Sequence, residues 1–170
     1  MKKLLLSMAV LLGAFTMSAE PVVVDFSTAT GLPTAEAEAP TSATINGVDF
    51  SFVNCKQGKY QGATYLQISG KNYEGKAYME FTAGFAVEKI TMHTGTNAST
   101  NVTVQLYAND VAIGDALKLG EKDADFTIAV PAANQAAGTK YKLATTNKYN
   151  AQITTLTLNG DGSAVEPPVV

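Results

Sequence analysis

Alternation of apolar and polar residues is the feature of this sequence that most restricts its fold. From Lys76 to Ala83 every second residue is apolar, and the segment from Asn101 to Tyr107 repeats the pattern. A period of two is typical of strands with one buried side and one solvent-facing side. Shorter stretches alternate in the same way, at Val48, Phe50 and Phe52; Leu66 and Ile68; Ile90 and Met92; Phe126, Ile128 and Val130; and Tyr141 and Leu143.

Turn signals separate these stretches. Asn46-Gly47 is a strong signal for a type I′ hairpin turn, and Asn109-Asp110 is expected to turn the chain as well. A change of phase across Thr154-Thr155 predicts a β-bulge or bend. The alanine-rich segment Pro131 to Ala137 predicts a single helical turn. About ten short strands at this spacing predict an all-β, antiparallel sandwich or barrel.

The N-terminal residues have the pattern of a signal peptide. Lys2 and Lys3 precede an apolar run from Leu4 to Phe15, and small residues follow up to Ala19. The run is too short for a membrane span, which needs roughly 20 apolar residues. We expect cleavage after Ala19, with Ser18 as the alternative, and hence a secreted, periplasmic or cell-surface protein that is not inserted in the membrane. A retained anchor is the competing interpretation.

The sequence is expected to form one domain. Removal of residues 1–19 from the 170 leaves 151, which is enough for a single hydrophobic core. We place the β-sandwich domain at residues 20–160. Residues 161–170 contain Pro167 and Pro168 and are expected to form a Pro-rich tail or the start of a linker.

Charge argues against nucleic acid as a partner. The chain has no arginine, and without Lys2 and Lys3 it carries ten lysines against fifteen acidic residues, a net charge of −5. Phosphate neutralisation by clustered cations dominates nucleic-acid affinity, and arginine is the best bidentate phosphate ligand. An anionic membrane surface is disfavoured for the same reason.

The residue content argues against a Cys–His or Ser–His catalytic site and against a zinc site. The chain has one cysteine, Cys55, and one histidine, His93. Cys55 is expected to be a buried apolar residue, and it permits no internal disulfide. His93 is expected on the solvent-facing side of a strand that buries Ile90 and Met92. One Cys and one His cannot fill a zinc site.

Carboxylates leave two further hypotheses open. Paired acids hydrolyse glycosidic bonds, and Glu80 lies outward on the same strand as Tyr78, although an outward Glu ordinarily serves solubility. The acidic run Glu121 to Asp125 offers oxygen ligands for calcium, as does Asp161 with Asn159. Neither matches an EF-hand loop, so a solvated acidic turn is favoured over a metal site and no cofactor is expected.

Tyrosines on the solvent-facing positions favour binding over catalysis. A tyrosine ring offers a flat apolar surface for a sugar ring together with a hydroxyl group for hydrogen bonding. The competing interpretation is that tyrosine simply favours strands, and alternation cannot show whether a ring is free. The candidate ligand-binding residues are Tyr65, Tyr78, His93, Gln105 and Tyr107.

The order of these strand patterns resembles the jelly-roll domains of exported proteins from Bacteroidetes-type bacteria, which include carbohydrate-binding-module-like and galactose-binding-like sandwiches. The resemblance rests on the segments 23–27, 43–52, 87–92, 102–107 and 151–158. It implies a jelly-roll sandwich that binds glycans. The chain departs from many members in lacking tryptophan and an attached catalytic domain, and the resemblance transfers no individual binding residue.

Three functions follow as hypotheses. The first is a non-catalytic binding module for a polysaccharide or other glycan. The second is a structural or adhesive surface module whose partner is a protein, which a long apolar edge strand would favour. The third is an enzyme, which would need a cleft with two facing carboxylates.

Overall fold

The structure is a computed structural model that describes residues 20–159. The expected signal peptide and the expected Pro-rich tail at residues 161–170 lie outside the described residues. The described part of the chain contains twelve strands and one 3-10 turn. In chain order they are β1 (Val22–Asp25), β2 (Thr41–Ile45), β3 (Val48–Val53), β4 (Cys55–Tyr60), β5 (Ala63–Ile68), β6 (Tyr78–Ala83), β7 (Lys89–Thr94), β8 (Thr103–Ala108), β9 (Val111–Lys118), β10 (Asp125–Ala129), η1 (Ala132–Asn134), β11 (Lys140–Thr145) and β12 (Ala151–Leu158).

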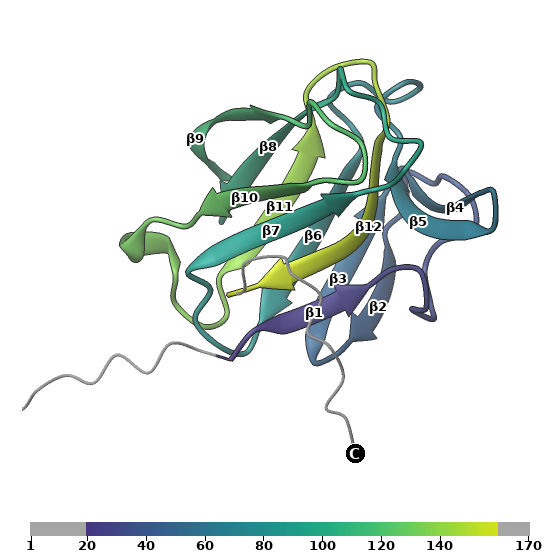
Figure 1. The fold of residues 1–170 in the computed structure, drawn as a ribbon. Coiled ribbons are helices and arrows are strands. Elements are labelled where there is room, and N and C mark those ends of the chain that lie inside the picture. Colours follow the sequence, from purple (N-terminus) through teal and green to yellow (C-terminus); the bar gives the residue numbers. More distant parts are fainter. Residues whose placement is uncertain (1–19, 160–170) are drawn as a thin grey trace, which may run out of the picture.

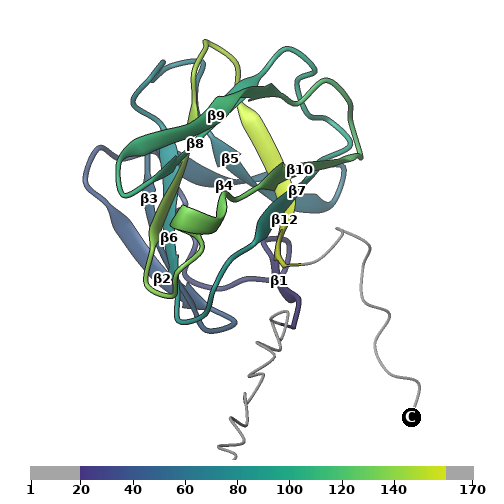
Figure 2. The same cartoon turned by 90° about the vertical axis from the view of Figure 1, so that its left-hand side faces the viewer.

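The strands form two antiparallel sheets of six. Sheet A has the order β10-β7-β12-β5-β4, and β1 also pairs with β12. Sheet B has the order β2-β3-β6-β11-β8-β9. Figure 1 looks onto sheet A, and Figure 2 views the two layers from the side. The predicted all-β sandwich is confirmed.

Local signals in the sequence produce the turns and the bulge as expected. Asn46 and Gly47 both have positive φ, at 50° and 77°, and join β2 to β3. Asn109 and Asp110, at 48° and 66°, join β8 to β9 in the same way. These values are those of type I′ turns, whose twist matches the flanking strands. The predicted helical turn forms at Ala132–Asn134.

The predicted irregularity in β12 is a register shift between Ile153 and Thr155. It divides the strand into two halves. Ala151 to Ile153 pair with β5, whereas Thr155 to Leu158 pair with β1 on the same edge. The bulge therefore lets β12 pair with β5 and β1 along one edge, while β7 pairs with its other edge.

The expected count of about ten strands was too low. The alternation did not reveal β4, because its sequence, Cys-Lys-Gln-Gly-Lys-Tyr, mixes lysines with a glycine and has no apolar period. Only one edge of β4 is paired within sheet A, with β5. Edge strands often carry lysine, which discourages pairing with other chains.

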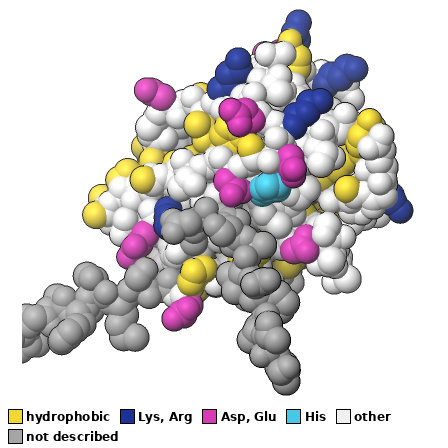
Figure 3. Space-filling view, in the orientation of Figure 1, with side chains coloured by type: hydrophobic (Ala, Val, Ile, Leu, Met, Phe, Trp, Pro, Cys, Tyr) yellow, Lys and Arg dark blue, Asp and Glu magenta, His cyan; other side chains and the backbone are white. Residues whose placement is uncertain are grey.

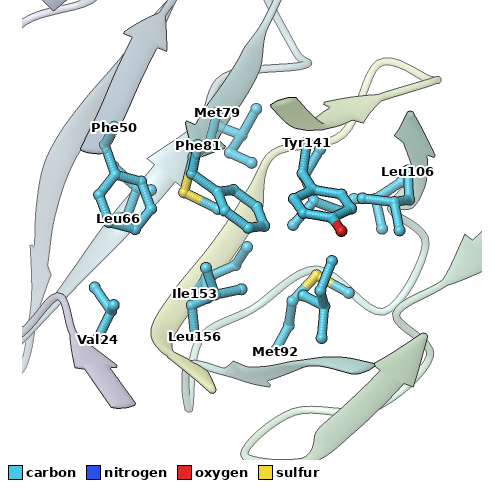
Figure 4. Packing of buried hydrophobic residues seen from close by; sticks show 14 of the residues in the cluster. Val24, Phe50, Leu66, Met79, Phe81, Met92, Leu106, Tyr141, Ile153 and Leu156 are labelled. Carbon is cyan, nitrogen blue, oxygen red and sulfur yellow. The ribbon is translucent and has the colours of Figure 1, made fainter. Parts of the chain in front are cut away.

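A continuous row of aromatic rings joins the two sheets. The centre of the Phe50 ring lies 5.9 Å from that of Phe26 and 5.8 Å from that of Phe81. The ring centres of Phe81 and Tyr141 are 5.4 Å apart. All four side chains are buried. Figure 4 shows Phe50, Phe81 and Tyr141 of sheet B facing Val24, Met92, Ile153 and Leu156 of sheet A. This core fixes which side of each strand points outward. No helix among residues 20–159 is long and apolar enough to cross a membrane.

We expect Phe81→Ala to lower the free energy of unfolding by about 3–5 kcal/mol, because it removes the ring at the centre of this row. Urea denaturation of residues 20–170, called the mature chain below because cleavage after Ala19 is expected, measures the change. Tyr149→Ala is the matched control, since Tyr149 is 37% exposed and its loss should change stability by less than about 0.5 kcal/mol. A loss below about 1 kcal/mol for Phe81→Ala would contradict the central place given to this ring.

Candidate functional site

The outer face of sheet B follows from the residues buried beneath it. In β6, Met79, Phe81 and Ala83 point into the core, so Tyr78 and Glu80 point outward. Strands β8 and β11 alternate in the same way. Their outward residues are Thr103, Gln105 and Tyr107 in β8, and Lys140, Lys142 and Ala144 in β11.

Strand pairing places two tyrosines around one lysine. Lys142 in β11 lies opposite Tyr107 in β8, and the next outward residue of β11, Ala144, lies opposite Tyr78 in β6. The Lys142 ammonium is 4.7 Å from the centre of the Tyr107 ring and 5.7 Å from that of Tyr78, within the range of cation–π attraction. We call this surface, defined by Tyr78, Tyr107, Lys142 and Ala144, the tyrosine face.

The tyrosine face spans more than one strand width. Strands β6 and β8 are separated by β11, so Tyr78 and Tyr107 lie about 10 Å apart across the sheet and about 7 Å apart along it. Both side chains are half-buried. Between Tyr78 and Gln105, Ala144 presents only a methyl group, so this position is low relative to the side chains around it.

Ion pairs balance the charge of the tyrosine face. The Lys142 ammonium is 2.7 Å from one carboxylate oxygen of Asp110, and the Lys140 ammonium is 3.3 Å from the other. Lys140 also lies 3.5 Å from Glu80. Hydrogen bonds from the two lysines lower the pKa of Asp110. Two cations and two anions therefore neutralise each other on an exposed surface.

Two hollows lie beside the tyrosine face, toward β2 and β3. One of 350 Å³ is lined by Ser42, Thr44 and Asp49, and another of 140 Å³ by Ser51, Glu80 and Thr82, together with neighbouring residues of the same strands. Their outward side chains are hydroxyl groups and carboxylates. The outer side of sheet B is thus uneven and polar beside its tyrosines.

Three of the five predicted ligand-binding residues lie on the outer side of sheet B: Tyr78, Gln105 and Tyr107. Gln105 also stabilises the sheet. Its side-chain amide donates hydrogen bonds to the carbonyl groups of Leu106 (2.9 Å), Ile113 (3.0 Å) and Gly114 (3.3 Å). It is only 8% exposed. Its amide nitrogen is therefore already occupied in holding β9 against β8.

The other two predicted residues lie on the opposite side of the sandwich. Tyr65 is on the outer face of sheet A, as expected, but it is only 8% exposed. Its ring lies over Gly58 in β4, where a Cβ atom would come within 2.2 Å of the ring carbon Cε2. The sequence left open whether this ring is free. It is covered, because its cross-strand partner Gly58 has no side chain and so leaves room for the ring against β4.

His93 faces outward from β7, as expected, between two carboxylates. Its Nδ1 is 2.8 Å from Asp125 and its Nε2 is 3.1 Å from Asp123. Figure 3 shows the single histidine of the chain beside acidic side chains on this face. Partial burial alone would lower its pKa, but the hydrogen bonds and charges of the two aspartates outweigh burial and raise it. Both ring nitrogens are engaged.

Cys55 is a buried core residue, as the sequence predicted. It is 1% exposed, and desolvation raises the pKa of its thiol to about 12. Two strands, β5 and β12, separate β4 from β7, so Cys55 lies about 14 Å or more from His93. A thiolate–imidazole pair is therefore not formed.

The acidic run expected to be a solvated turn or a calcium site supplies both aspartates that hold His93. Asn159, the other calcium candidate, uses its amide group to bind the backbone of Glu88 and Ala86. Asp161 lies outside the described residues. Within residues 20–159, no group of three or more His, Cys, Asp or Glu side chains is placed to hold a metal ion.

Sequence patterns missed Lys142 of the tyrosine face and its charged neighbours Lys140 and Asp110. The phase of Tyr141 and Leu143 does place both lysines outward, so this signal was present. Nothing in the sequence shows that β11 lies between β6 and β8, and only that order brings Lys142 between the tyrosines.

Stability should depend on pH through His93. Its folded-state pKa is raised above the ordinary value of 6.5, so the interaction with Asp123 and Asp125 stabilises the fold fully below that value. The stabilisation is lost as the pH rises through the folded-state pKa. Denaturation of the mature chain and of His93→Gln should therefore show a larger difference in unfolding free energy at about pH 5 than at about pH 9. A difference independent of pH would contradict this assignment.

Comparison with known proteins identifies the fold. No protein-family model matches the chain, and no curated protein matches it. Among solved structures, the CBM36-1 domain of a multidomain xylanase from the hindgut metagenome of Trinervitermes trinervoides matches with 17% identity and a TM-score of 0.50, covering 84% of this chain and 99% of that domain. CBM35 from Paenibacillus barcinonensis matches with 12% identity and a TM-score of 0.48, covering 72% of this chain and 99% of that one.

The catalytic domain of a GH87 α-1,3-glucanase also matches, with 17% identity and a TM-score of 0.48, over 88% of this chain but only 29% of its own length. None of these matches is named as a protein of Bacteroidetes, so they do not support that part of the resemblance. At such identities the likeness concerns the fold alone: the chain has the β-sandwich architecture that the CBM36-1 domain also has.

Proposed function

We propose that this chain is a non-catalytic, secreted or surface-exposed module that binds glycans on the tyrosine face. The observation that carries the proposal is the pair of outward tyrosines held on either side of Lys142. An apolar ring face with a hydroxyl group at its edge suits a sugar, which has apolar C–H surfaces and polar hydroxyl groups. The resemblance in fold to a carbohydrate-binding module adds support but assigns no residue.

The charge balance of the tyrosine face favours a neutral glycan. Each cation of the face is paired with Asp110 or Glu80, so an anionic sugar would have to displace a carboxylate to reach an ammonium group. A neutral sugar needs no such exchange. Its hydroxyl groups can accept hydrogen bonds from the lysines and donate to the carboxylates already present.

The same ion pairs argue against hydrolysis. A glycosidase needs one carboxylic acid that keeps its proton, and therefore a raised pKa, beside a second carboxylate. Asp110 and Glu80 lie on either side of Lys140, and the pKa of Asp110 is lowered. This arrangement is suited to binding and orientation rather than to general acid catalysis.

The same proposal includes export of the chain to the cell surface or out of the cell. It is supported by the Lys2-Lys3 pair, the apolar run to Phe15 and the small residues up to Ala19. A secreted module of this kind would meet polysaccharides outside the cell.

A protein partner is the second candidate, and one observation favours it. Strand β9 is an edge of sheet B, eight residues long, and its Val111 is 68% exposed. Such an edge can pair with a strand of another chain. However, a register shift opposite Val104 to Leu106 and the charged residues Asp115 and Lys118 blunt it, because bulges and charges on edges discourage pairing.

We expect Ala144→Leu to reduce glycan binding strongly, because a larger side chain would fill the low position between Tyr78 and Gln105. Tyr78→Ala and Tyr107→Ala should each weaken binding by roughly two- to tenfold, through loss of one aromatic contact. Affinity electrophoresis of the mature chain in gels containing xylan, β-glucan, mannan, galactan or polygalacturonate measures the effect. The neutral polysaccharides should retard the protein more than polygalacturonate.

Ala129→Leu is the matched control, because Ala129 points outward from β10 on the opposite sheet. It should bind as the parent chain does. Binding that survives Ala144→Leu and both tyrosine variants would overturn the tyrosine face as the binding site. Absence of retardation by every polysaccharide would favour the protein-partner candidate.

A further inference from the structure

A further hollow adjoins Tyr78 where β3 ends and β6 begins. It has a volume of 430 Å³, within the roughly 300–1,000 Å³ of small-molecule sites. Tyr78 forms part of its wall, so the hollow and the tyrosine face share this residue. The lining residues are Glu38, Val53, Asn54, Gly75, Lys76 and Tyr78.

Position links the hollow to the tyrosine face. A line from Tyr107 in β8 over Ala144 in β11 reaches Tyr78 in β6, and the next residue across the sheet is Val53 in β3, directly opposite Tyr78. Val53 lines the hollow. A chain-like ligand that lies along the two tyrosines would therefore reach the hollow next.

The charged groups of the hollow differ from those of the tyrosine face. On that face the lysines and carboxylates are paired with one another, whereas neither Glu38 nor Lys76 has an ion-pair partner among the described residues. Both are exposed. A carboxylate acceptor and an ammonium donor are thus available to the hydroxyl groups of a ligand without breaking an internal pair.

Asn54, which lines the hollow, carries an unusual unpaired acceptor. It is 2% exposed and held in place by its neighbours: its backbone N–H donates to Ala37, its carbonyl accepts from Ser69, and its side-chain amide donates to Lys76. Its side-chain Oδ1 has no hydrogen-bond partner among the described residues. Buried polar atoms are rarely left unpaired, because each costs free energy, and such exceptions often mark functional positions.

We propose that this hollow is a second sugar subsite, which binds one unit of the same glycan through Glu38, Lys76 and the region of Asn54. The proposal rests on the glycan-binding function given above. It assigns the specificity of the module to the hollow, because unpaired polar groups discriminate between hydroxyl patterns more sharply than a stacking surface does. The tyrosine face then contributes affinity with little selectivity.

The test uses isothermal titration of the mature chain with xylohexaose, cellohexaose and mannohexaose. Glu38→Ala and Lys76→Ala should each weaken binding of the preferred hexasaccharide roughly tenfold, through loss of a hydrogen bond to a charged group. They should also reduce the preference among the three sugars. Lys148→Ala and Glu121→Gln, which remove exposed charges elsewhere, should bind as the parent chain does.

Ala144→Leu separates this inference from the function on which it depends. If Ala144→Leu abolishes binding while Glu38→Ala and Lys76→Ala bind like the parent chain, the second subsite is wrong and the tyrosine face stands. If Ala144→Leu, Tyr78→Ala and Tyr107→Ala all bind like the parent chain, or no hexasaccharide binds at all, the proposed function fails and the subsite fails with it.

A second measurement avoids substitutions near Asn54, whose loss would disturb the fold. In ¹⁵N-labelled mature chain, the side-chain amide resonance of Asn54 and the backbone resonance of Gly75 should shift when the preferred hexasaccharide is added. Gly114 on the β9 edge should not shift. Unchanged Asn54 and Gly75 resonances at saturation would overturn the subsite.

Discussion

The row of aromatic rings between the sheets sets the register on which the outer surfaces depend. Phe50, Phe81 and Tyr141 lie on adjacent strands β3, β6 and β11, and each occupies an inward position. Because side chains alternate along a strand, a slip of one residue would send every inward ring to solvent. The energy lost by exposing such rings therefore fixes Tyr78 and Lys142 on the outer side.

This constraint also bears on the binding proposed for the tyrosine face, because it holds the two rings in place. A ring that must be immobilised on binding costs conformational entropy, so a ring already held in place binds more tightly. Lys142 contacts both tyrosine rings and is itself held by Asp110 from the turn between β8 and β9. The turn, the lysine and the tyrosines form one connected arrangement on a rigid sheet.

The outer faces of the two sheets use their polar residues differently. On sheet A, Glu36 binds Lys56 and Ser69, and Ser69 accepts from Gln67, so these groups are occupied by one another. His93 is likewise enclosed by its two aspartates. On sheet B the lysines and carboxylates are also paired with one another, but two half-buried tyrosine rings lie among them and hollows lie beside them.

The parts of this structure that could be predicted from sequence are those governed by neighbours along the chain. Alternation located β6 and β8 and pointed Tyr78 and Tyr107 outward, and Asn46-Gly47 identified its turn. Alternation could not detect β4, whose edge position removes the apolar pattern.

Contacts between segments far apart in the chain could not be predicted from the sequence. Alternation could not show whether the Tyr65 ring is free, because its exposure depends on Gly58, which strand pairing brings opposite it. The aspartates around His93 belong to β10 and the loop before it, and only the pairing of β10 with β7 brings them there. The unpaired oxygen of Asn54 likewise depends on the meeting of separate loops.

The most direct test is to map a bound glycan onto the two sheets. Backbone amide resonances of ¹⁵N-labelled mature chain would be followed during titration with soluble xylan, β-glucan and mannan oligosaccharides. If the glycan binds on the tyrosine face, the largest resonance shifts should occur in β6, β8 and β11, around Tyr78, Tyr107 and Ala144. Shifts confined to β7, β10 and β12 on sheet A, with sheet B unchanged, would contradict it.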